Sequence, residues 1–272
     1  MATIPYDLAD TVPLTIETRD ATGNLANATL VTLTVTLPDL TTAVPAVTNP
    51  SAGIYQADYT PTMAGRHTAR WVATGVNASG YSDIFDVREA TPPYLVSLYD
   101  MKQHLNLTTA VDDEELRGFI EAATRVVENV VGPVVVRTVS EVHGPGNLLT
   151  LNHPPVLALA SIAPVWTGGI TYAVGDVDLD ATTGIVRRLD GTPFVGPLRV
   201  TYSAGRRIVP ATMTMAAKVI VGHMWETQRG HIQARRPSSR TDDLTPIPGI
   251  SFMVPRRVLE LLDPDRRMPM MA

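Results

Sequence analysis

Alternating apolar and polar residues dominate the first ninety positions of the chain. Between Val31 and Leu37 four apolar residues alternate with threonines, and Leu14–Thr18 alternates in the same way. A period of two is typical of strands that bury one face. Turn residues separate these segments at intervals of about ten residues, as in two-layer β-sandwiches. We therefore expect residues 1–90 to form an all-β sandwich.

A short motif indicates which type of β-sandwich is present. Gly53–Ala57 reads GIYQA and resembles the tyrosine corner of immunoglobulin-like (Ig-like) domains, with Ala57 where disulfide-bonded members carry cysteine. The resemblance implies an Ig-like sandwich held by its core alone, with Trp71 in that core. Residues 91–93, Thr-Pro-Pro, then interrupt the strands. Proline cannot donate to a sheet and favours an extended chain, so this segment is predicted to be an interdomain linker.

After the linker the apolar period lengthens to that of a helix. Helices are predicted at 97–105, 112–131 and 212–228. Acidic residues open the second of them, where the helix dipole favours negative charge, and Gly132-Pro133 ends it. Shorter apolar runs predict strands at 134–142, 148–151, 161–167, 172–178, 184–189 and 198–202. We expect an α+β protein in which residues 94–230 form a mainly helical module with a small β-sheet.

Charge and cysteine content restrict the candidate functions. The chain has no cysteine, which excludes disulfides, thiol catalysis and cysteine-bound metals. Residues 94–198 carry 12 Asp and Glu against six Lys and Arg, and residues 199–272 carry the reverse. Regions of opposite charge can bring copies of a chain, or a chain and its partner, together.

Motifs for catalysis or for cofactor binding are not found in the sequence. Ala204–Arg207 precedes a predicted helix but lacks the spacing and the lysine of a phosphate-binding loop. Asp176–Asp180 resembles the front of a calcium loop, but Ala181 and Arg187 occupy the positions that need glycine and glutamate. The six histidines show no close pair with metal-ligand spacing. We predict a protein that is not an enzyme and needs neither cofactor nor metal.

The order of motifs in the second domain resembles that of the head-to-tail connector (adaptor) proteins of tailed bacteriophages. The similar features are the two opening helices, the Leu149–Ile162 passage with Pro154-Pro155, the hairpin around Gly184, and the strand, Ala204-Gly205 turn and proline-led helix of residues 200–217. The resemblance covers residues 94–230, and a segment at 254–262 is similar to a tail found in such proteins.

The resemblance implies a structural protein of the virion, located at the neck and assembled in the bacterial cytoplasm. Members form a ring, dodecameric in most cases, that extends the DNA channel between the portal and the stopper or tail. The implied partners are further copies of the chain, the portal protein, a stopper or tail-terminator protein, and genomic DNA that passes without sequence-specific binding. No membrane partner is expected, because no apolar run approaches about 20 residues.

Acidic residues are the candidates for the channel surface, because a basic lining would hold the phosphates of passing DNA. The candidates are Asp112, Asp113, Glu114, Glu115, Glu121 and Glu128. The alternative is that these residues cap helices and cover the outer surface.

Residues 231–272 are expected to form a C-terminal arm with a short helix that binds the portal. The candidate portal-binding residues are Arg256, Arg257, Val258, Leu261 and Leu262. Their apolar members share one side of a helix too short to be stable alone. The sequence leaves open that this helix folds back on its own domain. It also leaves open a second function, in which the Ig-like domain makes the chain an adhesion or decoration protein of a phage particle.

Overall fold

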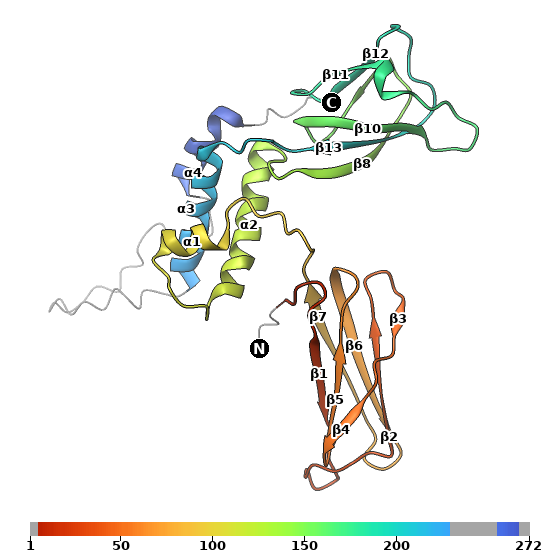
Figure 1. The fold of residues 1–272 in the computed structure, drawn as a ribbon, viewed down its shortest axis with the longest axis vertical. Coiled ribbons are helices and arrows are strands. Elements are labelled where there is room, and N and C mark those ends of the chain that lie inside the picture. The colour runs from red at the N-terminus through yellow and green to blue at the C-terminus, as the bar shows by residue number, and fades with distance from the viewer. Residues whose placement is uncertain (1–4, 229–254, 267–272) are drawn as a thin grey trace, which may run out of the picture. The chain divides into compact units, whose positions relative to one another are not determined.

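The computed structural model of the chain describes residues 5–228 and 255–266. The chain divides into two units, Met1–Pro92 and Pro93–Ala272. The division lies within residues 91–93, the segment expected to be a linker. Four antiparallel sheets lie in the described residues, so the fold is rich in β-structure (Figure 1).

The first unit consists of two sheets that share one core. One sheet has the order β3-β2-β6-β7, with β2 at Leu30–Thr36, β3 at Thr42–Ala43, β6 at Gly65–Thr74 and β7 at Ser79–Val87. The other has the order β1-β5-β4, with β1 at Val12–Glu17, β5 at Ile54–Tyr59 and β4 at Thr48–Ser51. Side chains from both sheets pack into a single apolar cluster, so the unit is a β-sandwich.

The register of the larger sheet explains the alternation in the sequence. Leu33 lies opposite Trp71 and Val35 opposite Ala69, and all four side chains are buried. The intervening threonines of β2 point away from the core, because successive strand residues face opposite sides. The prediction that Trp71 belongs to the core is confirmed.

The hydrogen bonds of Tyr55 differ from those expected in a tyrosine corner. In a tyrosine corner the hydroxyl bonds to backbone a few residues upstream. Here the Tyr55 hydroxyl accepts a bond from the Ala28 N–H at 3.0 Å and donates to the Ala28 carbonyl at 3.3 Å. Tyr55 lies in β5 and Ala28 precedes β2, so the hydroxyl ties together two strands of different sheets.

The second unit combines helices with two small sheets. Its helices are α1 (Leu98–Leu105), α2 (Asp113–Val131), α3 (Ala211–Gln228) and α4 (Arg256–Leu262), with 3-10 turns η1 (Val174–Asp176) and η3 (Asp263–Asp265). One sheet has the order β10-β13-β8, formed by Val156–Pro164, Leu198–Ala204 and Arg137–His143. The other has the order β11-β12-β9, formed by Val177–Asp180, Ile185–Arg188 and Leu148–Thr150.

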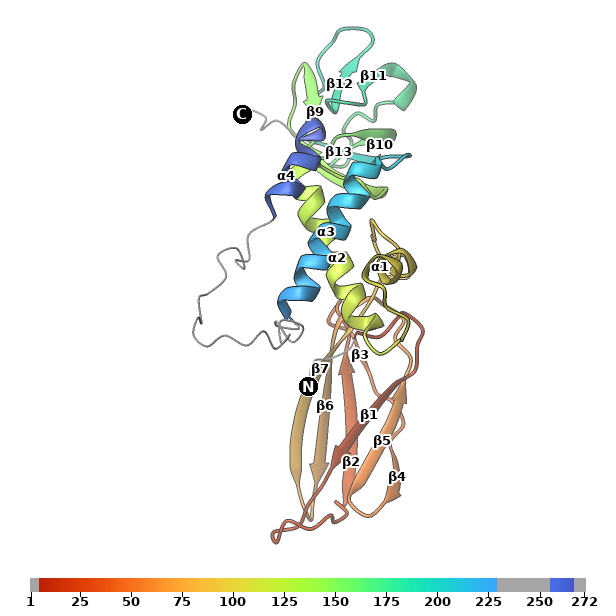
Figure 2. The ribbon, with the colours of Figure 1, turned by 90° about the vertical axis from the view of Figure 1, so that its left-hand side faces the viewer.

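The second unit has two small sheets, where the sequence predicted one. Each of its six strands overlaps a predicted strand, and the six form two separate sheets with an apolar cluster of their own. Figure 2 shows the strands gathered at one end of the long helices α2 and α3. The local pattern of a strand shows that it forms but not which strand it pairs with, so the number of sheets could not be predicted in this way.

Helices α2 and α3 pack against each other through stripes of helical period. The buried residues of α2 are Leu116, Ile120, Ala123, Thr124, Val127 and Val131. Those of α3 are Met213, Ala216, Ala217, Ile220 and Val221. They form one cluster, in which the alanines allow close approach of the two helices. The predicted helical period of the second helix is confirmed. Ser97 caps the first helix, because its Oγ accepts the Asp100 N–H at 3.0 Å.

Residues 93–272 expressed alone are expected to fold. Each unit has its own apolar clusters, and all described helices lie in the second unit. The molar helical signal in far-ultraviolet circular dichroism should therefore equal that of the full chain. Aggregation of the truncated chain, or loss of part of that signal, would contradict independent folding.

Candidate functional site

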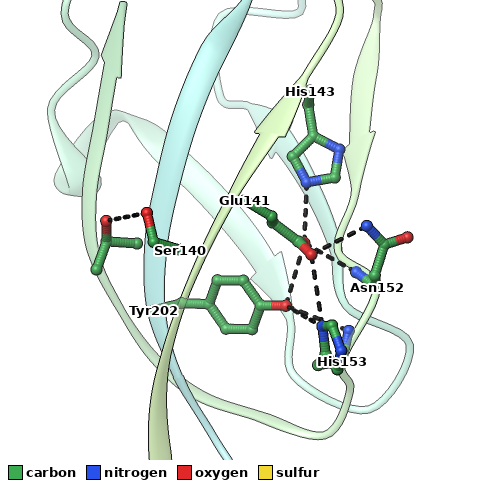
Figure 3. A network of polar contacts seen from close by, with 7 residues as sticks. Ser140, Glu141, His143, Asn152, His153 and Tyr202 are labelled. Atoms are coloured by element: carbon green, nitrogen blue, oxygen red, sulfur yellow. Dashed lines mark hydrogen bonds and ion pairs between the residues drawn. The ribbon is translucent and has the colours of Figure 1, made fainter. Parts of the chain in front are cut away.

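A network of polar side chains surrounds Glu141 in strand β8 (Figure 3). Glu141 Oε1 accepts bonds from the Asn152 backbone N–H at 2.9 Å and from the Tyr202 hydroxyl at 3.1 Å. Asn152 Nδ2 donates to Oε2 at 2.9 Å, and His143 Nε2 lies 2.9 Å from Oε1. His153 Nδ1 lies 3.5 Å from Oε2. A carboxylate only accepts, so His143 carries its proton on Nε2 in this contact.

Hydrogen bonding keeps Glu141 ionised. Its side chain is only 12% exposed, and this burial raises its pKa. The hydrogen bonds from the Asn152 backbone, the His143 ring, the Asn152 side chain and the Tyr202 hydroxyl together lower it by more. The pKa of Glu141 is therefore held below its ordinary value, because each of these donors stabilises the charged form.

The network fastens a loop to a sheet. Asn152 and His153 belong to the loop between β9 and β10, whereas Glu141 and Tyr202 belong to adjacent strands β8 and β13. The His153 N–H also donates to the Tyr202 hydroxyl at 3.2 Å. Each bond ends on Glu141 or Tyr202, so the cluster positions the loop that leads into Pro154-Pro155. In residues 5–228 and 255–266, no group of three or more His, Asp and Glu is arranged to hold a metal ion.

A second candidate feature is a pair of joined loops, here called the apolar tip, on which Val165, Trp166, Ile170 and Val195 are exposed. Trp166 is 70% exposed and Ile170 is 53% exposed. Most of the tip lies in the loop between β10 and η1, which extends beyond the strand end in Figure 1. The strand predicted over 161–167 is found at Val156–Pro164, so it begins earlier than predicted and ends before Trp166.

Several contacts hold the base of the apolar tip in place. Tyr172 is buried, its ring packs edge-on against Phe194 at 5.2 Å, and the guanidinium of Arg188 lies 5.0 Å from its centroid. Its hydroxyl accepts the Val195 N–H at 2.9 Å. The Val165 N–H donates to the Pro197 carbonyl at 3.0 Å, which joins the two loops of the tip. The apolar side chains are thus presented on a fixed support.

Most of the predicted channel acids have partners on the helices. Asp113 Oδ1 lies 2.6 Å from Lys102 Nζ, and Glu121 pairs with Arg125 at 3.0 Å. Glu114 pairs with Arg117 at 3.2 Å, and Glu115 accepts a bond from Gln228. Asp112 precedes the first turn of α2. A channel role for these five residues stays a prediction.

Glu128 has a different role. Its Oε1 accepts the backbone N–H groups of Val134 at 2.9 Å and Val135 at 3.0 Å, and Arg137 donates to both carboxylate oxygens. The side chain is mostly buried in these contacts. Glu128 therefore fixes the turn from α2 into β8, and a channel role for this residue also stays a prediction.

The described part of the C-terminal arm packs on its own unit. Val258 and Leu262 are both 0% exposed within the helical cluster, and Leu261 packs against that cluster. These apolar residues are thus covered by their own unit here, which is the alternative that the sequence left open, and their binding of a portal stays a prediction. Arg256 and Arg257 are exposed. Residues 231–254 and 267–272 of the arm lie outside the described residues.

The turn before α3 is built around Gly205. Its φ is +127°, in the region that favours glycine, and its N–H donates to the Pro155 carbonyl at 3.0 Å. The sharp turn expected from Ala204-Gly205 is confirmed. Arg206 follows, and its Nη1 lies 3.2 Å from Asp265 Oδ1, so it holds the end of α4 instead of a phosphate. Arg207 is exposed.

Comparisons with known proteins identify no family. No protein-family model and no curated protein matches the chain. The Lin-41 filamin domain is 25% identical with a TM-score of 0.29, over 32% of this chain and 86% of that one. A protein described as a glycoside hydrolase from Bacteroides vulgatus is 16% identical with a TM-score of 0.25, over 34% of this chain and 18% of that one. Similarities at these TM-scores carry no argument.

Among the described helices, none combines the length and the apolar character that crossing a membrane requires.

Proposed function

We propose that the chain is a structural assembly protein, a head-to-tail connector of a tailed bacteriophage that forms a ring between the portal and the stopper or tail. The observation that carries the proposal is the apolar tip. Exposed apolar patches on a fixed support mark protein interfaces, and tryptophan is enriched among the residues that dominate binding energy. Trp166 at 70% exposure has this character.

Two further features support the proposal. The resemblance of residues 94–230 to connector proteins rests on motifs that lie in defined elements here, including the helix pair α1–α2 and the Gly205 turn into α3. The opposite charge balance of residues 94–198 and 199–272 suits contacts between identical copies. On this proposal the chain acts without catalysis or a cofactor, and its location is the neck of the virion.

Trp166→Ser is expected to weaken ring formation about 30-fold, the effect of losing an interface residue worth about 2 kcal/mol. Native mass spectrometry and negative-stain images of the wild type, alone and with the portal protein, should show a closed ring. Leu40→Ser in the first unit is the matched control, because Leu40 is 82% exposed but lies outside the tip. Wild-type chains that stay monomeric under both conditions would contradict the proposed ring.

The alternative is an adhesion or decoration protein, and strand β7 favours it. Residues Ser79–Ile84 are all exposed at the edge of the larger sheet of the sandwich. The open edge of a strand can pair with a strand of another protein. If this alternative holds, residues 1–92 alone should bind capsids or host cells in a pull-down and the full chain should form no ring.

A further inference from the structure

Helix α4 is held on the second unit by one face and by an ion pair after its last turn. Val258 and Leu262 insert into the helical cluster, and Arg206 pairs with Asp265 just after the helix. The remaining face of α4 is exposed, with Leu259 and Arg257 on it. A helix of seven residues is not stable in water by itself. The helical state of α4 therefore depends on the surface on which it docks.

The chain between α3 and α4 is longer than this docking requires. The Arg206–Asp265 pair brings the end of α4 back to the start of α3. At 1.5 Å per residue, the 18 residues of α3 span about 27 Å. Residues 229–254, at up to about 3.3 Å each, reach about 85 Å. This length allows α4 to reach a second molecule as well as its own unit.

We infer that, in the ring, α4 of each copy docks on the helical cluster of a neighbouring copy, with Val258, Leu262 and Asp265 making across the interface the contacts seen here within one chain. The inference rests on the proposed ring. Identical chains offer identical docking surfaces, so exchange of an element between copies creates an interface without new contacts. In a closed ring every copy donates one α4 and receives one.

Charge favours the docking of α4 on either copy. Exposed Arg256, Arg257 and Arg266 flank α4, whereas residues 94–198 of each copy carry twice as many acidic as basic residues. A neighbouring copy therefore attracts α4 as its own unit does, and this attraction is strongest at low ionic strength.

Cysteine cross-linking tests where α4 docks. The chain has no cysteine, so in the double variant Arg206→Cys/Asp265→Cys a short bis-maleimide reacts only with the introduced pair. Exchange predicts covalent dimers and higher multimers on a denaturing gel after cross-linking of the assembled protein. The control is Arg66→Cys/Asp86→Cys, whose positions pair across β6 and β7 within one sandwich and must link within a chain.

Charge reversal provides a second readout that does not remove the charged pair. Arg206→Glu and Asp265→Arg each place like charges opposite one another, and each alone is expected to weaken assembly at least tenfold. In an equimolar mixture, exchange pairs Arg206 of one variant with Asp265 of the other, so assembly should recover. A mixture that behaves as the average of its components would overturn the inference.

The mass of the assembled wild type, together with the cross-linking result, tests the ring and the exchange of α4 separately. Assembled wild type with only intrachain cross-links overturns the exchange of α4 and leaves the ring standing. Wild type that stays monomeric, alone and with portal, overturns the ring, and the intrachain product then overturns the exchange as well.

Discussion

Gly205→Ala is expected to destabilise the second unit by about 3–4 kcal/mol. A Cβ at this position would lie 2.8 Å from Val136 Cα and 2.9 Å from the Val135 carbonyl oxygen. Both are backbone atoms, so they cannot move aside as a flexible side chain would. The φ of +127° adds strain for any residue with a Cβ. Urea unfolding of residues 93–272, followed by circular dichroism, measures the loss.

Gly191→Ala measures the cost of a positive φ without a close backbone contact. Gly191 also has a positive φ, +72°, but a Cβ there meets no atom within 4 Å. Its cost should therefore be the backbone strain alone, about 1 kcal/mol. Equal losses for the two variants would contradict the role assigned to the close backbone approach at Gly205.

The elements that the sequence predicted well are those whose pattern is local. The helix expected at 112–131 is found at Asp113–Val131, and that expected at 212–228 is found at Ala211–Gln228. Both carry apolar stripes of several turns, and each additional turn is further evidence of the helical period. Strand β2 was equally clear, because seven alternating residues specify which face is buried.

The candidate sites were harder to predict, because they depend on contacts between distant parts of the chain. Glu141, Asn152 and Tyr202 are brought together only by the pairing of β8 with β13 and the course of the loop after β9. The one sequence signal was a glutamate near the end of the strand predicted at 134–142 and a histidine two residues later, just beyond that end. A strand that continues through both places them on one face. Such a pair is equally compatible with an exposed face.

For the C-terminal helix, the sequence predicts an apolar side but not the surface that covers it. An apolar side formed by Val258, Leu261 and Leu262 must be covered, but its pattern is the same whether its own unit or another molecule covers it. Within the single chain, two of these side chains are buried against their own unit. In the same way, the exposure of Trp166 follows from the end of β10 at Pro164 and not from its apolar surroundings in the sequence.

Glu141→Gln is expected to lower the free energy of unfolding of residues 93–272 by about 2–3 kcal/mol at pH 7. The amide nitrogen of glutamine would face donors such as His143 and Asn152, and only one oxygen would remain to accept from them and from Tyr202. A buried donor left without an acceptor costs more than the average hydrogen bond. Glu121→Gln is the matched control, because Glu121 pairs only with Arg125 on an exposed helix face and should change stability by about 0.5 kcal/mol or less.

The pKa of Glu141 predicts how the free energy of unfolding depends on pH. The pKa of Glu141 lies below its ordinary value of 4.5 in the folded chain, so the unfolded chain binds its proton first as the pH falls. The stability due to Glu141 is complete above that value and is lost as the pH falls through the lower, folded pKa. His143, His153 and Tyr202 are the titratable groups that face it. Urea unfolding between pH 7 and pH 3 should therefore show a smaller acid loss for Glu141→Gln than for the wild type, whereas parallel curves would contradict this role.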